Sequence, residues 1–301
     1  MLQLDAIVVG GSFAGLSAAM QIARGRRHVA VIDAGKPRNR FAEHSHGFFA
    51  QDGVAPFEIV REGRAKLLAY PNVRFIDGHA VSAAGADGAF TVALASGETL
   101  QAPKLVLAIG VEDELPDITG VAERWGRTVL HCPYCHGYEF EGGPLAVLSV
   151  APGSVHQAML ISEWGPVTYL LNGGPDPDAE TLAKLTRRGV AIAAAQVRQI
   201  SSTDEFEQIH LVDGNIIPVK ALYLASRTRM ASPLAEQIGC AFDDGPFGPI
   251  IRTDAAKLTS VPGVYAAGDA ARAPHNATWA SADGVTAGVS LHQALVFGSR
   301  E

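Results

Sequence analysis

The sequence predicts an α/β protein built around two βαβ units, and three observations support this prediction. An apolar run, Ala6–Val9, leads into a glycine-rich turn at residues 10–15 and then into a small-residue helix. Residues 144–171 repeat the order of strand, turn, helix and strand. Near the end of the chain, a third apolar strand closes on Gly268-Asp269. With 301 residues and 48% hydrophobic content, the chain is long enough for two cores, so we expect two three-layer domains of the Rossmann type.

The first βαβ unit carries the pattern of a dinucleotide-binding site. The predicted helix runs from Leu16 to about Ala23, and a second strand over residues 28–32 closes on Asp33. A tight turn, a helix N-terminus and an acid at this spacing suit a pyrophosphate and a ribose hydroxyl. Ser12 replaces the middle glycine, although its small side chain still lets a phosphate approach the backbone. The binding candidates in this unit are Gly10, Ser12, Phe13, Ala14, Gly15 and Asp33. The alternative is a tight turn in an unrelated α/β protein.

The segment after this unit supplies further cofactor-binding candidates. Ala34 and Lys36 open a basic stretch that either meets a phosphate or is only solvated. His46 and Asp52 belong to a polar, glycine-containing loop that is typical of a cofactor-binding segment, whereas no spaced carboxylate or cysteine completes a metal site there. A helix is predicted over residues 56–69 and strands over 73–76, 80–82, 90–94 and 105–109. From these strands and their exits we add Val81, Ala108 and Gly110 as candidates.

The strongest chemical motif is His131-Cys132-Pro133-Tyr134-Cys135-His136. Two cysteines two residues apart can close a small, strained disulfide that opens by thiolate attack. The flanking histidines can supply or accept the proton that thiol chemistry needs. The candidate catalytic residues are therefore Cys132, Cys135, His136 and His131. Zinc would need a second cysteine pair, and the matching c-type haem motif would need an exported chain. The third cysteine, Cys240, is interpreted as a small buried hydrophobe.

The second βαβ unit has the outline of a nucleotide domain without its binding residues. Its strand over residues 144–148, helix over 155–164 and strand over 167–171 flank the turn Ser149–Ser154. Ser149 and Ala151 stand where glycines are needed, and a Cβ there crowds the turn. No acid or arginine cluster follows at Asn172. The sequence therefore predicts a retained scaffold with a lost nucleotide site, and a divergent site that binds NADPH weakly is the alternative. A helix from Leu182, a strand at 190–194, a hairpin around 213–215 and a strand at 221–225 follow.

The return segment completes the first domain. Residues 246–249 are rich in glycine and proline and are predicted to form a hinge. Gly268 permits a close approach of the backbone, and Asp269 can meet the ribityl and phosphate side of a flavin. Asn276, Ala277 and Thr278 then open a helix over residues 280–295, whose N-terminus suits an electron-rich ring. Trp279 is assigned to packing.

Charge and hydropathy narrow the class of partner and the location. The formal net charge of −7 makes neither nucleic acid nor an anionic membrane an expected partner. No run of about eighteen apolar residues would span a bilayer. The N-terminal residues 1–5 lack a basic region typical of a secretory signal, so a cytoplasmic location is expected.

Taken together, the G-G-S-F-A-G opening, the C-P-Y-C loop and the late V-Y-A-A-G-D segment match a known family in order and spacing. The chain resembles the low-molecular-weight thioredoxin reductases over nearly its whole length. The resemblance implies a discontinuous FAD-binding domain at residues 1–114 and 245–301, an inserted redox-disulfide, NADPH-like domain at 115–244, and a homodimer. His136 stands where that family usually has an aspartate. In C-P-Y-C-H the chain is more similar to flavin-dependent dithiol oxidases of the gliotoxin and holomycin type.

The leading functional hypothesis is an FAD-dependent thiol–disulfide oxidoreductase that oxidises a small-molecule or peptide dithiol, with oxygen as acceptor. A substrate thiolate attacks Cys132, and His136 is the general acid or base. The resemblance implies that Cys135 passes the electron pair to the flavin. The first alternative is an NADPH-dependent disulfide reductase of the thioredoxin reductase kind, although NADPH binding is doubtful. The second alternative is a non-enzymatic, FAD-bound redox sensor.

Overall fold

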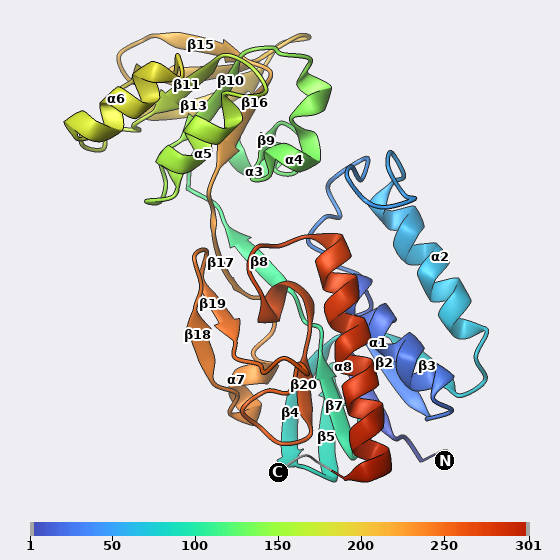
Figure 1. The fold of residues 1–301 in the computed structure, drawn as a ribbon. Coiled ribbons are helices and arrows are strands. Elements are labelled where there is room, and N and C mark those ends of the chain that lie inside the picture. The colour runs from blue at the N-terminus through green and yellow to red at the C-terminus, as the bar shows by residue number, and fades with distance from the viewer. Residues whose placement is uncertain (1–2, 299–301) are drawn as a thin grey trace. The chain divides into compact units, whose positions relative to one another are not determined.

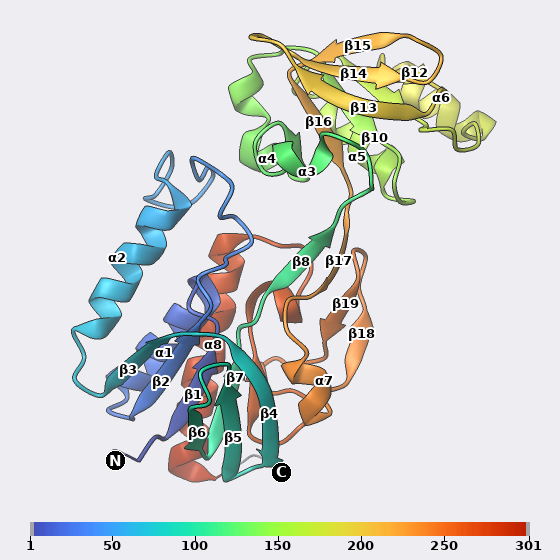
Figure 2. The same ribbon diagram turned by 180° about the vertical axis from the view of Figure 1, so that it is seen from behind.

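The computed structural model describes residues 3–298, which form two compact units (Figures 1 and 2). The first unit contains the chain up to Arg40, then Pro56–Glu112, then the chain from Thr228 onward. The second unit contains Phe41–Ala55 and Asp113–Arg227. Met1 and Leu2, which belong to the N-terminal stretch considered for a signal, lie outside the described residues.

A five-stranded parallel sheet forms the centre of the first unit, in the order β20-β7-β1-β2-β3. Its central strands are fully buried and apolar except for Lys104 at the start of β7, as expected for a parallel sheet that is covered on both faces. The two predicted strands of the first βαβ unit are confirmed. The strands are β1 (Ala6–Val9), β2 (Val29–Asp33), β3 (Val73–Asp77), β7 (Lys104–Leu107) and β20 (Val264–Ala266).

Helices cover one face of this sheet (Figure 1). They are α1 (Phe13–Arg24), α2 (Pro56–Leu68) and α8 (Ala277–Phe297). Helices α1 and α8 pack closely because glycines of α8 face the backbone of α1. A Cβ on Gly284 would lie 2.1 Å from the Ala14 carbonyl oxygen, and one on Gly288 would lie 2.5 Å from that of Ala18. This contact explains why the predicted final helix is rich in small residues.

The other face of the sheet is covered by a three-stranded antiparallel sheet, a short helix and a hairpin (Figure 2). These elements are β4 (Ala80–Ala86), β5 (Ala89–Leu94), β6 (Thr99–Ala102), α7 (Leu234–Ile238), β18 (Phe242–Asp244) and β19 (Pro249–Ile251). The predicted hinge at residues 246–249 is wrong, because residues 246–248 lie in the turn between β18 and β19 and Pro249 begins β19. Gly248 has a φ of 153°, and a Cβ there would lie 2.1 Å from the Thr228 carbonyl oxygen, which explains the glycine.

The second unit is also a three-layer structure. Its parallel sheet has the order β12-β11-β10-β16-β9, with helices on one face and the antiparallel sheet β13-β14-β15 on the other. The strands are β9 (Val129–Leu130), β10 (Leu145–Leu148), β11 (Val167–Leu170), β12 (Ala191–Ala193), β13 (Val197–Ser202), β14 (Glu207–Leu211), β15 (Ile216–Val219) and β16 (Ala221–Leu224). The helices are α3 (Val121–Arg124), α4 (Pro133–His136), α5 (Ser154–Ile161), α6 (Ala179–Arg187) and the 3₁₀ helix η1 (Tyr138–Phe140).

The chain passes between the units through a two-stranded sheet of β8 (Val111–Glu114) and β17 (Arg227–Met230). Residues 228–244 were predicted to belong to the inserted domain, but they group with the first unit. Leu234, Ala235 and Cys240 are buried in the first unit's core, which accounts for the difference and confirms the interpretation of Cys240. Which ligand each domain binds is not tested by this grouping and stays a prediction.

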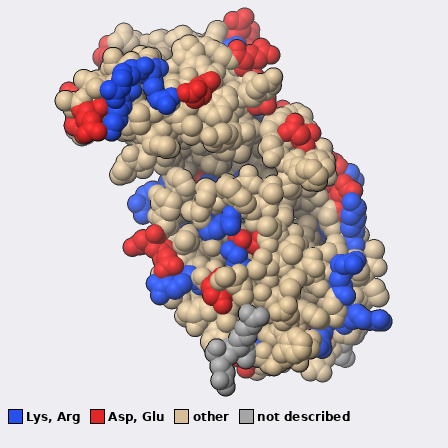
Figure 3. All heavy atoms as spheres, in the orientation of Figure 1, with Lys and Arg blue, Asp and Glu red and all other residues tan. Residues whose placement is uncertain are grey.

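One face of the surface carries charges of both signs. On the face drawn in Figure 3, lysine and arginine side chains are interspersed with acidic ones. Among residues 3–298, no helix is both long and apolar enough to span a membrane. The same residues contain no group of three or more histidine, cysteine, aspartate or glutamate side chains placed to hold a metal ion.

Candidate functional site

The glycine-rich turn between β1 and α1 is sterically required. Gly10 has a φ of 106°, and a Cβ there would lie 2.1 Å from the Ala108 carbonyl oxygen. A Cβ on Gly15 would lie 1.8 Å from the Gly10 carbonyl oxygen. Neither position accepts a side chain without movement of the backbone, so the turn keeps the tight shape that a pyrophosphate needs.

The N-terminus of α1 retains its capacity to bind an anion. Ser12 occupies the N-cap position, yet its side chain makes no capping hydrogen bond. The backbone N–H groups of the first turn of this twelve-residue helix therefore have no side-chain cap, as a phosphate site requires. Phe13 and Ala14 follow as the first helical residues. The acid at the end of β2 is also in place, because Asp33 Oδ1 accepts a hydrogen bond of 3.1 Å from the Gly11 N–H.

Four neighbouring strands bring predicted residues to one edge of the sheet. Gly10, Asp33, Ala108 and Gly268 lie at the carboxyl ends of β1, β2, β7 and β20. Gly268 has a φ of 77°, and a Cβ there would lie 2.9 Å from the Ala14 Cβ. In an open α/β sheet this edge is where dinucleotides bind. The N-terminus of α1, the close backbone approach at Gly268 and the Asp33 carboxylate together fit an FAD.

Asp269 and the start of α8 lie beside an arginine that the sequence analysis did not single out. Arg38 Nη1 lies 3.4 Å from Asp269 Oδ2 and 2.6 Å from His275 Nδ1. Arg38 belongs to the basic stretch after β2, but no local signal distinguished it from Lys36 or Arg40. Asn276 caps α8, because its Oδ1 accepts from the Thr278 N–H at 2.8 Å, and Ala277 is the first residue of the helix.

The remaining cofactor candidates are more scattered. Ala34 and Lys36 are exposed after β2, and Val81 lies near the start of β4. Gly110 has a φ of 68°, and its carbonyl oxygen accepts from the Ala231 N–H at 3.2 Å. Their role as cofactor ligands stays a prediction. Trp279, which was assigned to packing, is 44% exposed with the Arg272 guanidinium 5.3 Å from its ring centroid.

His46 and Asp52 lie in a loop that groups with the second unit, and their role as cofactor ligands stays a prediction. His46 Nε2 is 3.5 Å from Glu139 Oε1, and His46 Nδ1 is 3.8 Å from Asp52 Oδ1. Asp52 Oδ1 also accepts from the Gly47 N–H at 2.8 Å, which fixes the loop. The structure thus brings this loop to the segment that follows the cysteines.

The cysteine pair is held at the start of a short helix. Strand β9 ends at Leu130, Cys132 is the N-cap of α4, and Pro133 is its first residue, where a missing N–H costs nothing. Both Cys132 and Cys135 are partly exposed. A thiolate from a substrate can therefore reach the pair, as disulfide exchange requires.

His136 lies beside the cysteine pair, and its surroundings favour the neutral form of its imidazole. It is the last residue of α4, directly after Cys135. Burial lowers the pKa of His136 below its usual 6.5; the charge of His46 also lowers this pKa, while that of Glu139 raises it. Its imidazole is therefore mainly neutral at neutral pH and can accept a proton from a thiol.

His131 is the more exposed of the two flanking histidines. Its ring packs against Trp125 with centroids 5.9 Å apart, and its carbonyl oxygen accepts from Gln157 Nε2 at 2.9 Å. The loop also presents two aromatic side chains to solvent. Tyr134 is 69% exposed and contacts Trp164 edge-on at 5.2 Å, and Tyr138 is 85% exposed.

The turn of the second βαβ unit is closed by its own side chains. Ser154 Oγ accepts hydrogen bonds from the N–H groups of Val150 and Ala151, both at 3.2 Å. The Tyr169 hydroxyl donates to Ser149 Oγ at 3.0 Å. Asn172, at the end of the next strand, accepts from the Val197 N–H at 2.9 Å. The groups that would meet a nucleotide phosphate or ribose are used within the protein.

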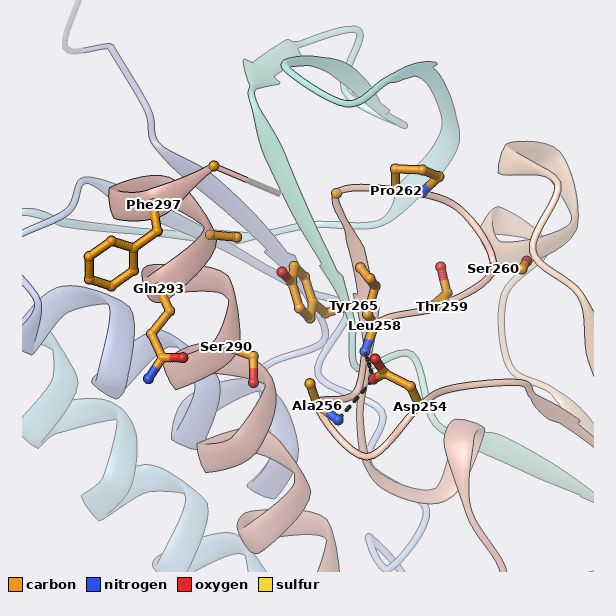
Figure 4. A pocket seen from close by; sticks show the side chains of 13 residues that line it. Asp254, Ala256, Leu258, Thr259, Ser260, Pro262, Tyr265, Ser290, Gln293 and Phe297 are labelled. Atoms are coloured by element: carbon orange, nitrogen blue, oxygen red, sulfur yellow. Dashed lines mark hydrogen bonds between the residues drawn. The ribbon is translucent and has the colours of Figure 1, made fainter. Parts of the chain in front are cut away.

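A further pocket of about 290 Å³ lies in the first unit, between the loop over residues 254–263 and the C-terminal half of α8 (Figure 4). Asp254 Oδ1 accepts from the N–H groups of Ala256 and Leu258, so its carboxylate stabilises that loop. None of the predicted catalytic or cofactor-binding residues lines this pocket, as far as residues 3–298 show it.

Comparison with known proteins now adds to this geometry. The family model for pyridine nucleotide-disulphide oxidoreductases matches residues 4–284. The chain belongs to this family. It is 32% identical to thioredoxin reductase sirT of Leptosphaeria maculans, over 96% of this chain and 93% of that protein. It is also 32% identical to thioredoxin reductase tcpT of Claviceps purpurea, over 88% and 86% of the two chains.

Among solved structures, an oxidoreductase from Agrobacterium tumefaciens superposes with a TM-score of 0.95 and 41% identity, covering 98% of this chain and 99% of that one. The resemblance to thioredoxin reductases and the predicted fold class are confirmed. The chain is an enzyme of the disulfide oxidoreductase class, and its family membership implies that it binds FAD.

Proposed function

We propose that this chain is an FAD-dependent dithiol oxidase, which converts a small-molecule or peptide dithiol to a disulfide and passes the electrons to oxygen. The observation that carries the proposal is the closed turn of the second βαβ unit. Its backbone donors are taken by Ser154, so a nicotinamide nucleotide lacks the phosphate cradle that a reductase of this family needs. Electrons are therefore expected to enter through the cysteines.

In the first half of the reaction, His136 accepts the proton of a substrate thiol, and the resulting thiolate attacks Cys132 Sγ. The bond between the two enzyme sulfurs breaks, and Cys135 leaves as a thiolate that receives the proton from His136. The neutral imidazole that burial favours is the form needed for this step.

In the second half, the other thiol of the substrate attacks the substrate sulfur of the mixed disulfide. The bond to Cys132 breaks, and the cyclic or intramolecular disulfide leaves. The enzyme has then gained two electrons and two protons. When bound, FAD would carry two electrons from the cysteine pair to oxygen. The oxygen would thereby be reduced to hydrogen peroxide.

The residues that would hold FAD are those at the carboxyl edge of the first sheet, with the pyrophosphate at the N-terminus of α1 and the ribose at Asp33. The division into an FAD-binding domain, expected at 1–114 with 245–301, and a redox domain, expected at 115–244, is part of the same proposal, with residues 228–244 moved to the first domain because they group with it. The exposed rings of Tyr134 and Tyr138 beside the cysteines favour a substrate with an apolar surface. We further propose that the protein is cytoplasmic and that it forms a homodimer. Sedimentation of the purified protein would test the homodimer.

The first experiment measures oxygen consumption with a series of dithiols for the wild type, Cys132→Ser, Cys135→Ser and Cys240→Ser. Either substitution in the pair removes a sulfur that the exchange needs, so turnover should be lost. Cys240 is buried at the Thr259 hydroxyl and serves as the matched control, with activity expected to be retained. Turnover that persists in Cys135→Ser would contradict the proposal, and a wild type that turns over no dithiol would favour a non-enzymatic redox sensor.

The second candidate is an NADPH-dependent disulfide reductase, which the names of the fungal relatives favour. It predicts rapid oxidation of NADPH in the presence of a disulfide. The closed turn argues against it, since three positions that would contact the nucleotide are occupied with internal hydrogen bonds.

A further inference from the structure

Gln157 is a buried glutamine that the proposed reaction does not use. It lies on α5, one turn after Ser154, and is 8% exposed. Its Nε2 donates a hydrogen bond of 2.9 Å to the carbonyl oxygen of His131, the residue before Cys132. Its Oε1 is buried and meets no donor among residues 3–298. A buried polar atom without a partner lowers the stability of a fold, so a glutamine at this position calls for a functional reason.

The contact with His131 sets the orientation of the Gln157 amide. A carbonyl oxygen accepts only from a donor, so Nε2 must face His131 and Oε1 must face away from it. A methionine of similar length would fill the same space without an unpaired oxygen. The hydrogen bond to the cysteine loop is therefore what glutamine provides here and an apolar side chain would not.

His131, the residue that Gln157 holds, is also held through its side chain. The ring of His131 packs against that of Trp125 with centroids 5.9 Å apart, and Trp125 is buried. Both the backbone and the side chain of His131 are therefore in contact with the rest of the second unit. The His131 carbonyl belongs to the planar peptide group that precedes Cys132, so these contacts restrict the rotation that orients the Cys132 side chain.

The other end of the cysteine helix is held by the turn that follows α5. Trp164 comes three residues after the end of α5, and its ring meets that of Tyr134 edge-on at 5.2 Å. A Cβ on Gly137 would lie 2.6 Å from Trp164 Cδ1, so this glycine lets the end of α4 lie directly against the indole. Helix α5 and its following turn thus contact the cysteine segment at both ends.

We propose that Gln157 is a positioning residue for thiol–disulfide exchange, which acts by holding the peptide group before Cys132 through the carbonyl oxygen of His131. In this exchange a substrate thiolate bonds to Cys132 Sγ, the bond between the enzyme sulfurs breaks, and Cys135 leaves with the electron pair as a thiolate. The attacking sulfur must approach in line with the bond that breaks, so a rotated Cys132 side chain slows the step. This inference rests on the proposed redox role of the pair.

The test compares Gln157→Met with Ser154→Ala. Methionine keeps the length of the glutamine but removes both its donor and its unpaired oxygen. Ser154 is a buried polar residue of the same helix, and its hydroxyl binds the turn at Val150 and Ala151. The oxidised holoenzyme is mixed with dithiothreitol without oxygen, and the reaction is stopped with acid. Alkylation of the thiols and mass spectrometry then give the initial rate at which the cysteine pair is reduced.

For Gln157→Met we expect this rate to fall by about tenfold, while the melting temperature and the FAD content stay at their wild-type values. Ser154→Ala should react at the wild-type rate at a temperature where it is fully folded. Gln157→Glu can donate to the His131 carbonyl only when its carboxyl group is protonated. The ratio of its rate to that of Gln157→Met should therefore rise as the pH falls.

An unchanged rate in Gln157→Met would overturn the inference alone. An equal loss of rate in Ser154→Ala would also overturn it, because α5 would then support the cysteines only through the general stability of the unit. A wild-type pair that forms no disulfide, or whose disulfide dithiothreitol does not reduce, would overturn the proposed function together with the inference.

Discussion

The two βαβ units of this chain follow the same path but treat their first turns in opposite ways. In the β1–α1 turn, the Ser12 side chain caps no backbone group, and the glycines are in contact with other backbone. In the β10–α5 turn, Ser154 binds two backbone N–H groups, while a Cβ on Gly153 would meet no atom within 4 Å. The comparison teaches that the same βαβ scaffold forms with or without sterically required glycines and an uncapped helix N-terminus at its first turn.

The ends of the second strands show the same divergence. Asp33 ends β2 and accepts from the Gly11 N–H, within the turn that would hold the phosphate. Asn172 follows β11 and accepts from the Val197 N–H, at the start of the neighbouring antiparallel sheet. The side chain at this position therefore bonds to the glycine turn in the first unit and to the antiparallel sheet in the second.

The largest effect is expected from a matched pair of alanine substitutions. Gly15→Ala places a Cβ 1.8 Å from the Gly10 carbonyl oxygen and should abolish FAD retention on gel filtration. Gly153→Ala, at a φ of −69°, should leave FAD content and turnover unchanged. Circular dichroism establishes that both variants fold. Full FAD content in Gly15→Ala would contradict the claim that only the β1–α1 turn requires its glycines.

If electrons enter at the cysteines, His136 should control how kcat/KM for a dithiol depends on pH. His136→Gln removes the base and should lower kcat/KM for a dithiol by about a hundredfold at neutral pH. In the wild type, the acid limb of the profile should lie below pH 6.5, because burial lowers the pKa of His136. Glu139→Gln removes a charge that raises this pKa, so the acid limb should move to still lower pH. An acid limb that moves upward in Glu139→Gln would contradict this assignment.

A smaller effect is expected at the strand ends. Asp33→Asn should weaken FAD binding by about tenfold, since the ribose loses a charged acceptor. Asn172→Asp retains the acceptor for Val197 and should confer no NADPH binding. Titration calorimetry of each variant checks both results. If Asn172→Asp bound NADPH, a single substitution would be enough to restore nucleotide binding in the second unit.

The smallest effect is expected at Ser154. Ser154→Ala leaves the N–H groups of Val150 and Ala151 without their acceptor and should lower the free energy of unfolding by about 1 kcal/mol. Urea denaturation measures this change. Dithiol turnover should persist. A fall in turnover under conditions where the variant is fully folded would assign the closed turn a role in catalysis.

Local patterns in the sequence predicted most of the fold. The apolar runs at β1, β7 and β10 are buried parallel strands as expected, and Gly10, Gly15 and Asp33 meet at the sheet edge because their spacing already encodes a βαβ unit. The β18–β19 turn was mistaken for a hinge, because glycine and proline mark a turn without showing which strands flank it.

The residues that the sequence did not reveal act through long-range contacts. Arg38 meets Asp269 across 231 residues, and Tyr223 on β16 pairs with Leu130 on β9, about ninety residues earlier in the chain. Nothing in the neighbouring residues distinguishes Tyr223 from the other aromatic residues of buried strands. His46 stays a predicted cofactor ligand, and its contact with Glu139, about ninety residues later in the chain, was not predicted from the sequence.

The most direct test of the central claim is the rate at which the bound flavin is reduced without oxygen. The FAD-loaded wild type is mixed in a stopped-flow instrument with dithiothreitol or with NADPH, and the visible flavin absorbance is followed. We predict that the dithiol removes the flavin absorbance and that this loss requires Cys132 and Cys135. With NADPH, the flavin absorbance should persist. Rapid bleaching by NADPH, with none by dithiols, would contradict the account.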